Sequence, residues 1–179
     1  MKQFIFKNLK YDPNNLDSTH KALKKIFSEE DCVRFRIEED AVIVRIDKYP
    51  KSSIQCSMLQ LKDFIKEDSA KFIVRMNIQK RMYIKGKRGS HVPIRGFPQI
   101  VKKFKSIAEK NGFKVLNFTS ISDPYLLYKE KNGQQSSFNT IDFEGHLKIT
   151  DSDLFKQAYE NGIGPSKNYG YGMLILDKG

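Results

Sequence analysis

The sequence predicts an α+β fold made of tandem ferredoxin-like units with antiparallel sheets. In the second half, the periodicity of apolar residues gives the order strand, helix, strand, strand, helix, strand, which is that of a ferredoxin-like unit. The first half gives strand, helix, strand and strand, so it is either a second unit or a degenerate copy. A length of 179 residues and a hydrophobic content of 39% suit one domain or two small ones with real cores.

The first half begins with a strand and an amphipathic helix. Alternating apolar residues predict the strand over residues 3–9, and the turn residues that follow offer a helix N-cap. The helix is expected over residues 16–27, because four residues at helical spacing share one face: Leu16, His20, Leu23 and Phe27. Two strands and then a short helix or irregular apolar segment are expected at residues 33–38, 41–46 and 58–65.

The second half is expected to form the complete unit. Pro98 suits the first turn of a helix, and Asn111-Gly112 is a signal for its end. Asn132-Gly133 favours a type I′ turn at the tip of a hairpin, and Gly145 suggests a bulge in the returning strand. The remaining elements are expected as strands at 72–75, 113–121, 125–129, 138–149 and 173–176 and a helix at 153–161.

A basic stretch separates the two halves. Its charges are Lys80, Arg81, Lys85, Lys87, Arg88 and Arg95. Because glycines and a proline interrupt them, we expect an exposed loop rather than a helix. The predicted domains are therefore residues 1–79, a linker over 80–97 and residues 98–179, with the first strand of the last domain starting near residue 70.

The charge balance points to an anionic partner. Lys plus Arg is 32 and Asp plus Glu is 21, so the net charge is +11 and the pI is about 9.5, which indicates nucleic acid or an anionic membrane. The chain has no apolar run of membrane-spanning length and no signal peptide, so we expect a cytoplasmic protein with no membrane partner. The two cysteines and three histidines lack metal-ligand spacing, so we expect neither a metal nor a cofactor.

A glycine-rich segment over residues 162–172 stands between the last helix and the last strand. Four glycines and a proline in this segment require unusual backbone angles or a very close approach. Its N–H groups could line an anion-sized concavity, with Lys167 as the cation. The alternative is a connection that only packs tightly. The order helix, loop, strand excludes the Rossmann fingerprint, which needs strand, loop, helix.

These segments together resemble a known family. Phe143-Glu144-Gly145, Gly162-Ile163-Gly164-Pro165-Ser166-Lys167 and Tyr169-Gly170-Tyr171-Gly172-Met173-Leu174 resemble the end of the CasE family, the CRISPR RNA-processing endoribonucleases of the type I-E Cascade complex. Upstream, Arg75-Met76-Asn77 with Lys80-Arg81 is similar to the family's Arg-x-Asn-Pro-x-Lys-Arg segment, with Ile78 in place of proline. The first helix also resembles the family's, and His20 falls where the family keeps its active-site histidine.

The resemblance implies a fold, an activity and partners. The fold is a tandem pair of ferredoxin-like (RRM-like) domains. The activity is metal-independent cleavage of a CRISPR repeat RNA stem-loop at its base, which gives a 2′,3′-cyclic phosphate. The product stays bound together with the other Cascade subunits. The residues implied or favoured as RNA contacts are Lys21, Lys24, Arg75, Asn77, Lys80, Arg81, Lys87, Arg88, Lys129, Lys131, Gly162, Gly164, Ser166 and Lys167.

His20 is the predicted catalytic residue, because imidazole exchanges protons near neutral pH. Lys24, one turn further on, could stabilise the charge of a phosphate. From its position on the apolar helix face alone, His20 reads as a half-buried histidine without a role, and the resemblance is what favours the catalytic interpretation. Each basic run could be a solvated surface. The family usually has a tyrosine three residues before the histidine, where this chain has Asp17. That aspartate could pair with His20 and raise the imidazole's pKa, favouring a general acid, or simply suit the first helical turn.

Three functions are compatible with the sequence. The first is a repeat-specific endoribonuclease. The second is a catalytically weak or inactive RNA-binding subunit, marked by Asp17. The third is a general RRM-like RNA-binding protein outside CRISPR biology. They differ in whether a cyclic-phosphate product forms and in whether a repeat hairpin is preferred over random RNA.

Overall fold

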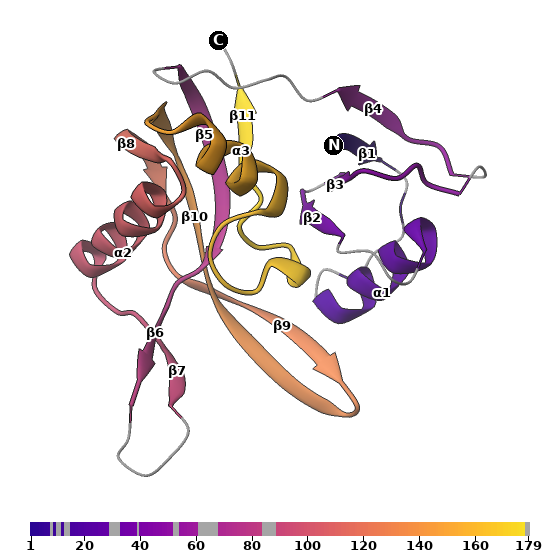
Figure 1. Cartoon of the computed structure of the whole chain (residues 1–179). Coiled ribbons are helices and arrows are strands. Elements are labelled where there is room, and N and C mark those ends of the chain that lie inside the picture. Colours follow the sequence, from indigo (N-terminus) through magenta and orange to yellow (C-terminus); the bar gives the residue numbers. More distant parts are fainter. Residues whose placement is uncertain are drawn as a thin grey trace.

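The computed structural model describes residues 1–7, 9, 12, 15–28, 33–38, 40–51, 54–60, 68–83 and 89–177. Two antiparallel sheets stand beside each other, and helices pack on them (Figure 1). The predicted α+β class with antiparallel sheets is confirmed. Within the described ranges, no helix has the length and apolar character needed to cross a membrane.

The first sheet holds four strands in the order β2-β3-β1-β4. Its elements are β1 (Lys2–Phe6), α1 (Leu16–Phe27), β2 (Arg34–Ile37), β3 (Val42–Ile46) and β4 (Ser57–Gln60). The expectation of a helix or irregular segment at 58–65 is wrong where the structure describes it, because residues 57–60 pair with the edge of β1. A sequence pattern cannot reveal such a pairing with a distant strand.

Helix α1 has the predicted bounds. The Asn15 side chain caps it by accepting a hydrogen bond of 3.2 Å from the Asp17 backbone N–H. Asp17 in the first turn and Lys24 near the last turn also suit the helix dipole. The buried face, with Leu23 and Phe27 fully covered, packs on the aromatic residues of the first sheet. His20 therefore lies on a helix that is firmly anchored to its sheet.

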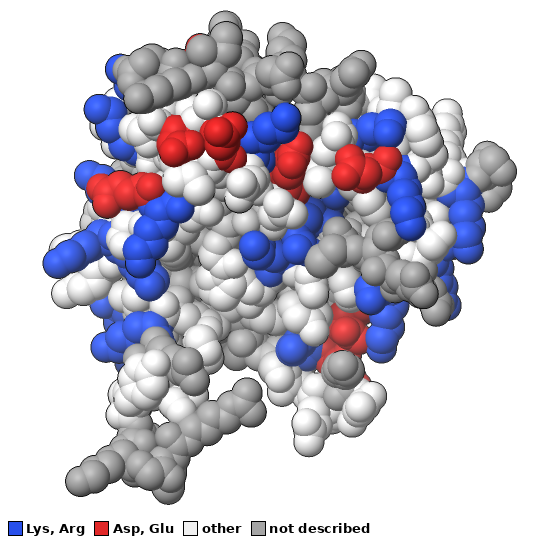
Figure 2. Space-filling view, in the orientation of Figure 1, with Lys and Arg blue, Asp and Glu red and all other residues white. Residues whose placement is uncertain are grey.

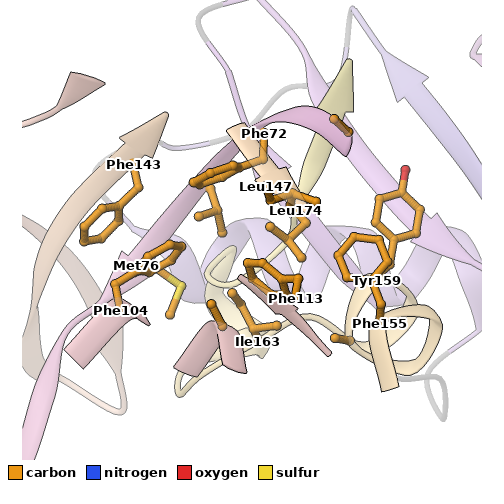
Figure 3. Packing of buried hydrophobic residues seen from close by; sticks show 14 of the residues in the cluster. Phe72, Met76, Phe104, Phe113, Phe143, Leu147, Phe155, Tyr159, Ile163 and Leu174 are labelled. Atoms are coloured by element: carbon orange, nitrogen blue, oxygen red, sulfur yellow. The ribbon is translucent and has the colours of Figure 1, made fainter. Parts of the chain in front are cut away.

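The second sheet has the strand order β11-β5-β10-β8, which is that of a complete ferredoxin-like unit, and β9 pairs with the far part of β10. Its elements are β5 (Ser69–Asn77), α2 (Phe97–Lys110), β8 (Phe113–Ile121), β9 (Tyr125–Lys131), β10 (Gln134–Ile149), α3 (Ser152–Asn161) and β11 (Ile175–Asp177). Stacked rings fill its core, with the Phe104 ring centroid 4.3 Å from Phe143 and 5.8 Å from Phe72 (Figure 3).

Strand β5 belongs to this second sheet, where it lies between β10 and β11. A domain boundary at residue 79 would therefore divide the sheet, whereas the alternative start near residue 70 would not. That the two halves fold as separate domains stays a prediction.

The basic stretch between the halves is not a simple loop. Residues 79–82 (β6) and 90–93 (β7) form a two-stranded antiparallel ribbon, in which Lys80 lies opposite Val92. The expectation of a loop throughout 80–97 is corrected accordingly, and the ribbon projects away from both sheets (Figure 1). Lys85, Lys87 and Arg88 lie outside the described residues.

The β9–β10 hairpin extends beyond the second sheet toward α1 (Figure 1). At its tip, Asn132 and Gly133 have φ values of 53° and 73°, as a type I′ turn requires. The register of β10 against β8 shifts at Gly145, where an added Cβ would lie 2.2 Å from the Asn117 carbonyl oxygen. The predicted bulge is thus confirmed. The hairpin carries Lys129 to the space beside α1.

Candidate active site

The glycine-rich segment folds back on itself between the two sheets. The Ile163 N–H donates to the Gly172 carbonyl at 2.8 Å, and the Gly172 N–H donates to the Arg75 carbonyl at 2.7 Å. Gly172 has a φ of 75°, and a Cβ there would lie 1.9 Å from the Ile163 carbonyl oxygen. Close backbone approach therefore explains this glycine, as the tight-packing alternative supposed.

The side chains predicted to hold phosphate already have partners within the protein. Ser166 accepts a hydrogen bond of 2.9 Å from the Asn77 amide, and the Lys167 ammonium donates to the Gly162 carbonyl at 3.1 Å. Contacts of Gly162, Gly164, Ser166 and Lys167 with RNA remain predictions. What the segment does display is a 3₁₀ turn over Lys167–Tyr169 (η1), which lies against α1 and β2 (Figure 1).

His20 lies where α1 meets that turn. Its ring stacks on Phe35 of β2 at a centroid distance of 6.3 Å, and the ring of Tyr169 lies 6.0 Å away. The imidazole is half-buried, and among the described residues its buried Nδ1 atom has no hydrogen-bond partner. The fold thus brings a residue of the first helix next to the C-terminal segment.

Burial lowers the pKa of His20 below its ordinary value of 6.5, and the positive charges of Lys24 and Arg34 lower it further. Asp17 acts in the opposite direction but does not reverse the shift. Its carboxylate lies 2.7 Å from the Lys21 ammonium and forms an ion pair with it. Asp17 thus raises the pKa of His20 as expected, but burial and the neighbouring cations outweigh it, so the net shift is downward and does not favour a general acid. A neutral imidazole is suited to accept a proton.

The titration of His20 gives a direct check. In the free protein, its pKa should lie below 6.5 and should rise in a Lys24→Met variant, because a neighbouring positive charge is removed. Since the folded-state value is below the unfolded one, the His20 contribution to stability is present above pH 6.5 and is lost as the pH falls through the folded-state pKa. NMR titration of the ring protons, assigned with His91→Gln and His146→Gln, measures this. A midpoint above 6.5 would contradict the geometry.

His20 has two neighbours that the sequence did not predict as site residues. Tyr169 contacts its ring, and Arg34 acts on its charge from β2. Arg34 also donates from Nη1 to the Asn168 side chain at 2.7 Å and from Nε to the Asn161 carbonyl at 2.8 Å, which ties the C-terminal segment to β2. Tyr169 lies within the family motif, but only the tertiary contact reveals its place beside the histidine.

Lys129, a predicted RNA contact, reaches the same place from β9. Its ammonium lies 3.4 Å from the Tyr169 hydroxyl and 4.5 Å from the centre of that ring. His20 and Lys24 lie on α1 and Lys129 lies on β9, and the two elements meet at Tyr169 of η1, whose ring contacts His20 and whose hydroxyl contacts Lys129. An imidazole surrounded by cations is an arrangement that can bind a phosphodiester and move a proton on it.

The other predicted contacts lie elsewhere. Arg75 binds Asp142 at 3.0 Å and donates to the Ile37 carbonyl, which connects the two sheets. Asn77 is buried, and Lys80 is exposed on β6. Arg81 and Lys131 lie on strands, but their side chains are not among those that the structure describes. Lys87 and Arg88 lie outside the described residues.

The charges are unevenly distributed on the face shown in Figure 2. Most acidic side chains form a band across the upper part of this face, whereas basic side chains also cover its middle and lower parts.

Comparison with known proteins establishes the relationship. The model of a family described as "CRISPR associated protein" matches residues 5–178, nearly the whole chain. The chain belongs to this family. No curated protein sequence matches it.

Solved structures show the same fold. A CRISPR endoribonuclease Cse3 bound to a 19-nucleotide RNA is similar with a TM-score of 0.80 and 19% identity, over 99% of both chains. The CRISPR-associated protein Cas6e from Escherichia coli K-12 is similar with a TM-score of 0.78 and 20% sequence identity, over 98% of both chains. A chain of E. coli Cascade bound to a PAM-containing double-stranded DNA target is similar with a TM-score of 0.59 and 17% sequence identity, over 98% of both chains. The family resemblance and the tandem ferredoxin-like fold predicted from the sequence are both confirmed.

Proposed function

We propose that the protein is a metal-independent endoribonuclease that binds CRISPR repeat stem-loops in precursor RNA and cleaves them to give mature guide RNA. The observation that carries the proposal is His20 in a chain of the CRISPR-associated family. Its half-buried imidazole has a pKa lowered by burial and by Lys24 and Arg34, and it contacts Tyr169, the residue that Lys129 reaches. A family member whose fold matches an endoribonuclease, and which presents a proton acceptor among cations, is equipped for RNA cleavage.

The chemistry follows from these groups. Neutral His20 accepts the proton of the 2′-OH next to the scissile phosphate, and the 2′-oxygen attacks phosphorus. The bond from phosphorus to the 5′-oxygen breaks, which leaves a 2′,3′-cyclic phosphate and, once the leaving oxygen gains a proton, a 5′-OH. Lys24 and Lys129 stabilise the negative charge that grows on the phosphate oxygens.

Binding of the stem draws on the basic surface. A-form RNA offers a major groove too narrow for side chains, so shape and phosphate contacts dominate its recognition. The β9–β10 hairpin with Lys129 and the β6–β7 ribbon with Lys80 are the elements that we propose contact the stem. Because similar chains include Cse3 bound to RNA and a component of Cascade, we also propose that the product remains bound and that other Cascade subunits are partners, in the cytoplasm.

A cleavage assay tests the proposal. The full chain is incubated with its end-labelled repeat hairpin in EDTA, and we expect a product ending in a 2′,3′-cyclic phosphate. The matched control is the same hairpin with a 2′-deoxy nucleotide at the scissile position, which should bind equally well and stay intact because it lacks the nucleophile.

Cleavage of the deoxy substrate, or a requirement for divalent metal, would contradict the mechanism. Tight and salt-sensitive binding without any product would instead support the inactive RNA-binding subunit. Equal binding of random RNA would support a general RNA-binding protein.

A further inference from the structure

The active site described above contains a phenol with no assigned task. Tyr169 is the tyrosine, among those the structure describes, whose ring contacts His20. Other tyrosine hydroxyls of this region are occupied: Tyr125 donates to Asp142, and Tyr171 shares a hydrogen bond of 2.7 Å with Thr140. On α1 itself, the residue one turn before His20 is Asp17, which is engaged with Lys21.

Tyr169 is held in place by the short turn that contains it. Its N–H donates to the Ser166 carbonyl at 2.9 Å, and the flanking residues Ser166 and Gly170 both have left-handed backbone angles, with φ of 63° and 86°. The ring packs on Phe138 of β10 at a centroid distance of 5.4 Å. A phenol fixed by its backbone and by rings on two sides is preorganised for one position.

Lys129 determines what the hydroxyl can do. An ammonium group has three donors and no acceptor, so in the 3.4 Å contact the Tyr169 oxygen accepts and its own hydrogen points elsewhere. The hydroxyl of the half-buried Tyr169 can therefore donate its own hydrogen to another group, such as a phosphodiester bound beside His20. The same ammonium would stabilise the negative charge of the oxygen if the hydrogen left as a proton.

The mechanism proposed above needs such a donor. His20 removes a proton from the 2′-OH, so a different group has to supply one to the 5′-oxygen as it leaves phosphorus. We propose that Tyr169 is a second catalytic residue, the general acid that protonates the leaving 5′-oxygen, with Lys129 orienting its hydroxyl. This inference rests on the proposed function.

The protons balance over one turnover. The 2′-OH gives its proton to His20, and Tyr169 gives its proton to the 5′-oxygen as the bond to phosphorus breaks. The resulting phenolate, next to Lys129, regains a proton as the protonated imidazole releases one. Both residues return to their starting states, and the net result is one proton transferred from the 2′-oxygen to the 5′-oxygen.

A substrate with a better leaving group tests this role. We would measure single-turnover cleavage of the repeat hairpin and of the same hairpin with sulfur in place of the scissile 5′-oxygen, because a thiolate leaves without being protonated. Tyr169→Phe should slow cleavage of the oxygen substrate by about 10²-fold or more and that of the sulfur substrate by less than about 10-fold. The phenylalanine keeps the ring contacts, and a thermal melt checks the fold.

Tyr128→Phe is the matched control, because it makes the same chemical change at the neighbouring position of β9, where side chains point to the opposite face. It should cleave both substrates at the wild-type rate. Equal slowing of both substrates by Tyr169→Phe would overturn the acid role in favour of positioning, and an unchanged rate would overturn any role. If the wild-type chain cleaves neither substrate, the proposed function itself fails, and this inference fails with it.

Discussion

Replacing His20 with alanine should lower the rate of repeat RNA cleavage by about 10²- to 10⁴-fold and leave RNA binding nearly unchanged. The imidazole is the group that accepts a proton in the proposed step, and its burial keeps it neutral at pH 7. Binding should persist because it depends on cations spread over several elements rather than on the neutral ring. Single-turnover cleavage and filter binding on the same hairpin separate the two effects.

The two other histidines serve as controls for this variant. His146 lies on β10, where its Nδ1 is 2.9 Å from the Asn117 side chain, and His91 is exposed on β7. Alanine at either position should cleave within a few-fold of the wild-type rate. Robust cleavage by His20→Ala, or an equal loss in all three variants, would remove His20 from the active site.

The second large effect is expected at Arg45, a fully buried arginine on β3. Its guanidinium donates to the Tyr159 carbonyl, to the Leu174 carbonyl at 2.9 Å and to the Gln3 side chain at 2.8 Å. It also lies 3.7 Å from the centre of the Tyr159 ring. Burial lowers its pKa to about 10, so it is still charged at neutral pH. One side chain of the first sheet thereby binds α3 and the segment before β11.

Arg45→Met should reduce the free energy of unfolding by about 3 kcal/mol or more, because each buried acceptor left without a donor costs about 1–3 kcal/mol. Urea denaturation measures the change. Arg95→Met, at an exposed arginine, is the control and should change stability by less than about 0.5 kcal/mol. A loss below about 1 kcal/mol at Arg45 would show that the three acceptors find other partners.

The same variant should also slow cleavage. Arg45 fixes the C-terminal segment against the first sheet, and that segment positions Tyr169 beside His20. A small displacement across this contact would separate the two catalytic groups. Stability and cleavage should therefore fall together in Arg45→Met, whereas they should separate in His20→Ala, which leaves the contact between the sheets intact.

Local patterns in the sequence determined the helices and the hairpin. The bounds of α1 follow from helical spacing and the turn before Leu16, and the β9–β10 turn follows from Asn132-Gly133, because both depend on neighbours within a few residues. Strand β4 and the β6–β7 ribbon were missed, since their backbone partners are supplied by separate segments. For the same reason, the sequence did not show which of the two sheets β5 joins, and so whether the domain boundary lies before or after it.

The sequence by itself also pointed to His20 and to the family, because both are carried by residue types in a characteristic order. Only the tertiary structure decided which groups surround that histidine. It paired Asp17 with Lys21, turned Lys167 inward to Gly162, placed Tyr169 next to the imidazole and brought Lys129 to Tyr169. Side chains on α1, β9 and the C-terminal turn meet across an interface between two sheets. Such distances depend on how the sheets pack, and no spacing along the chain records them.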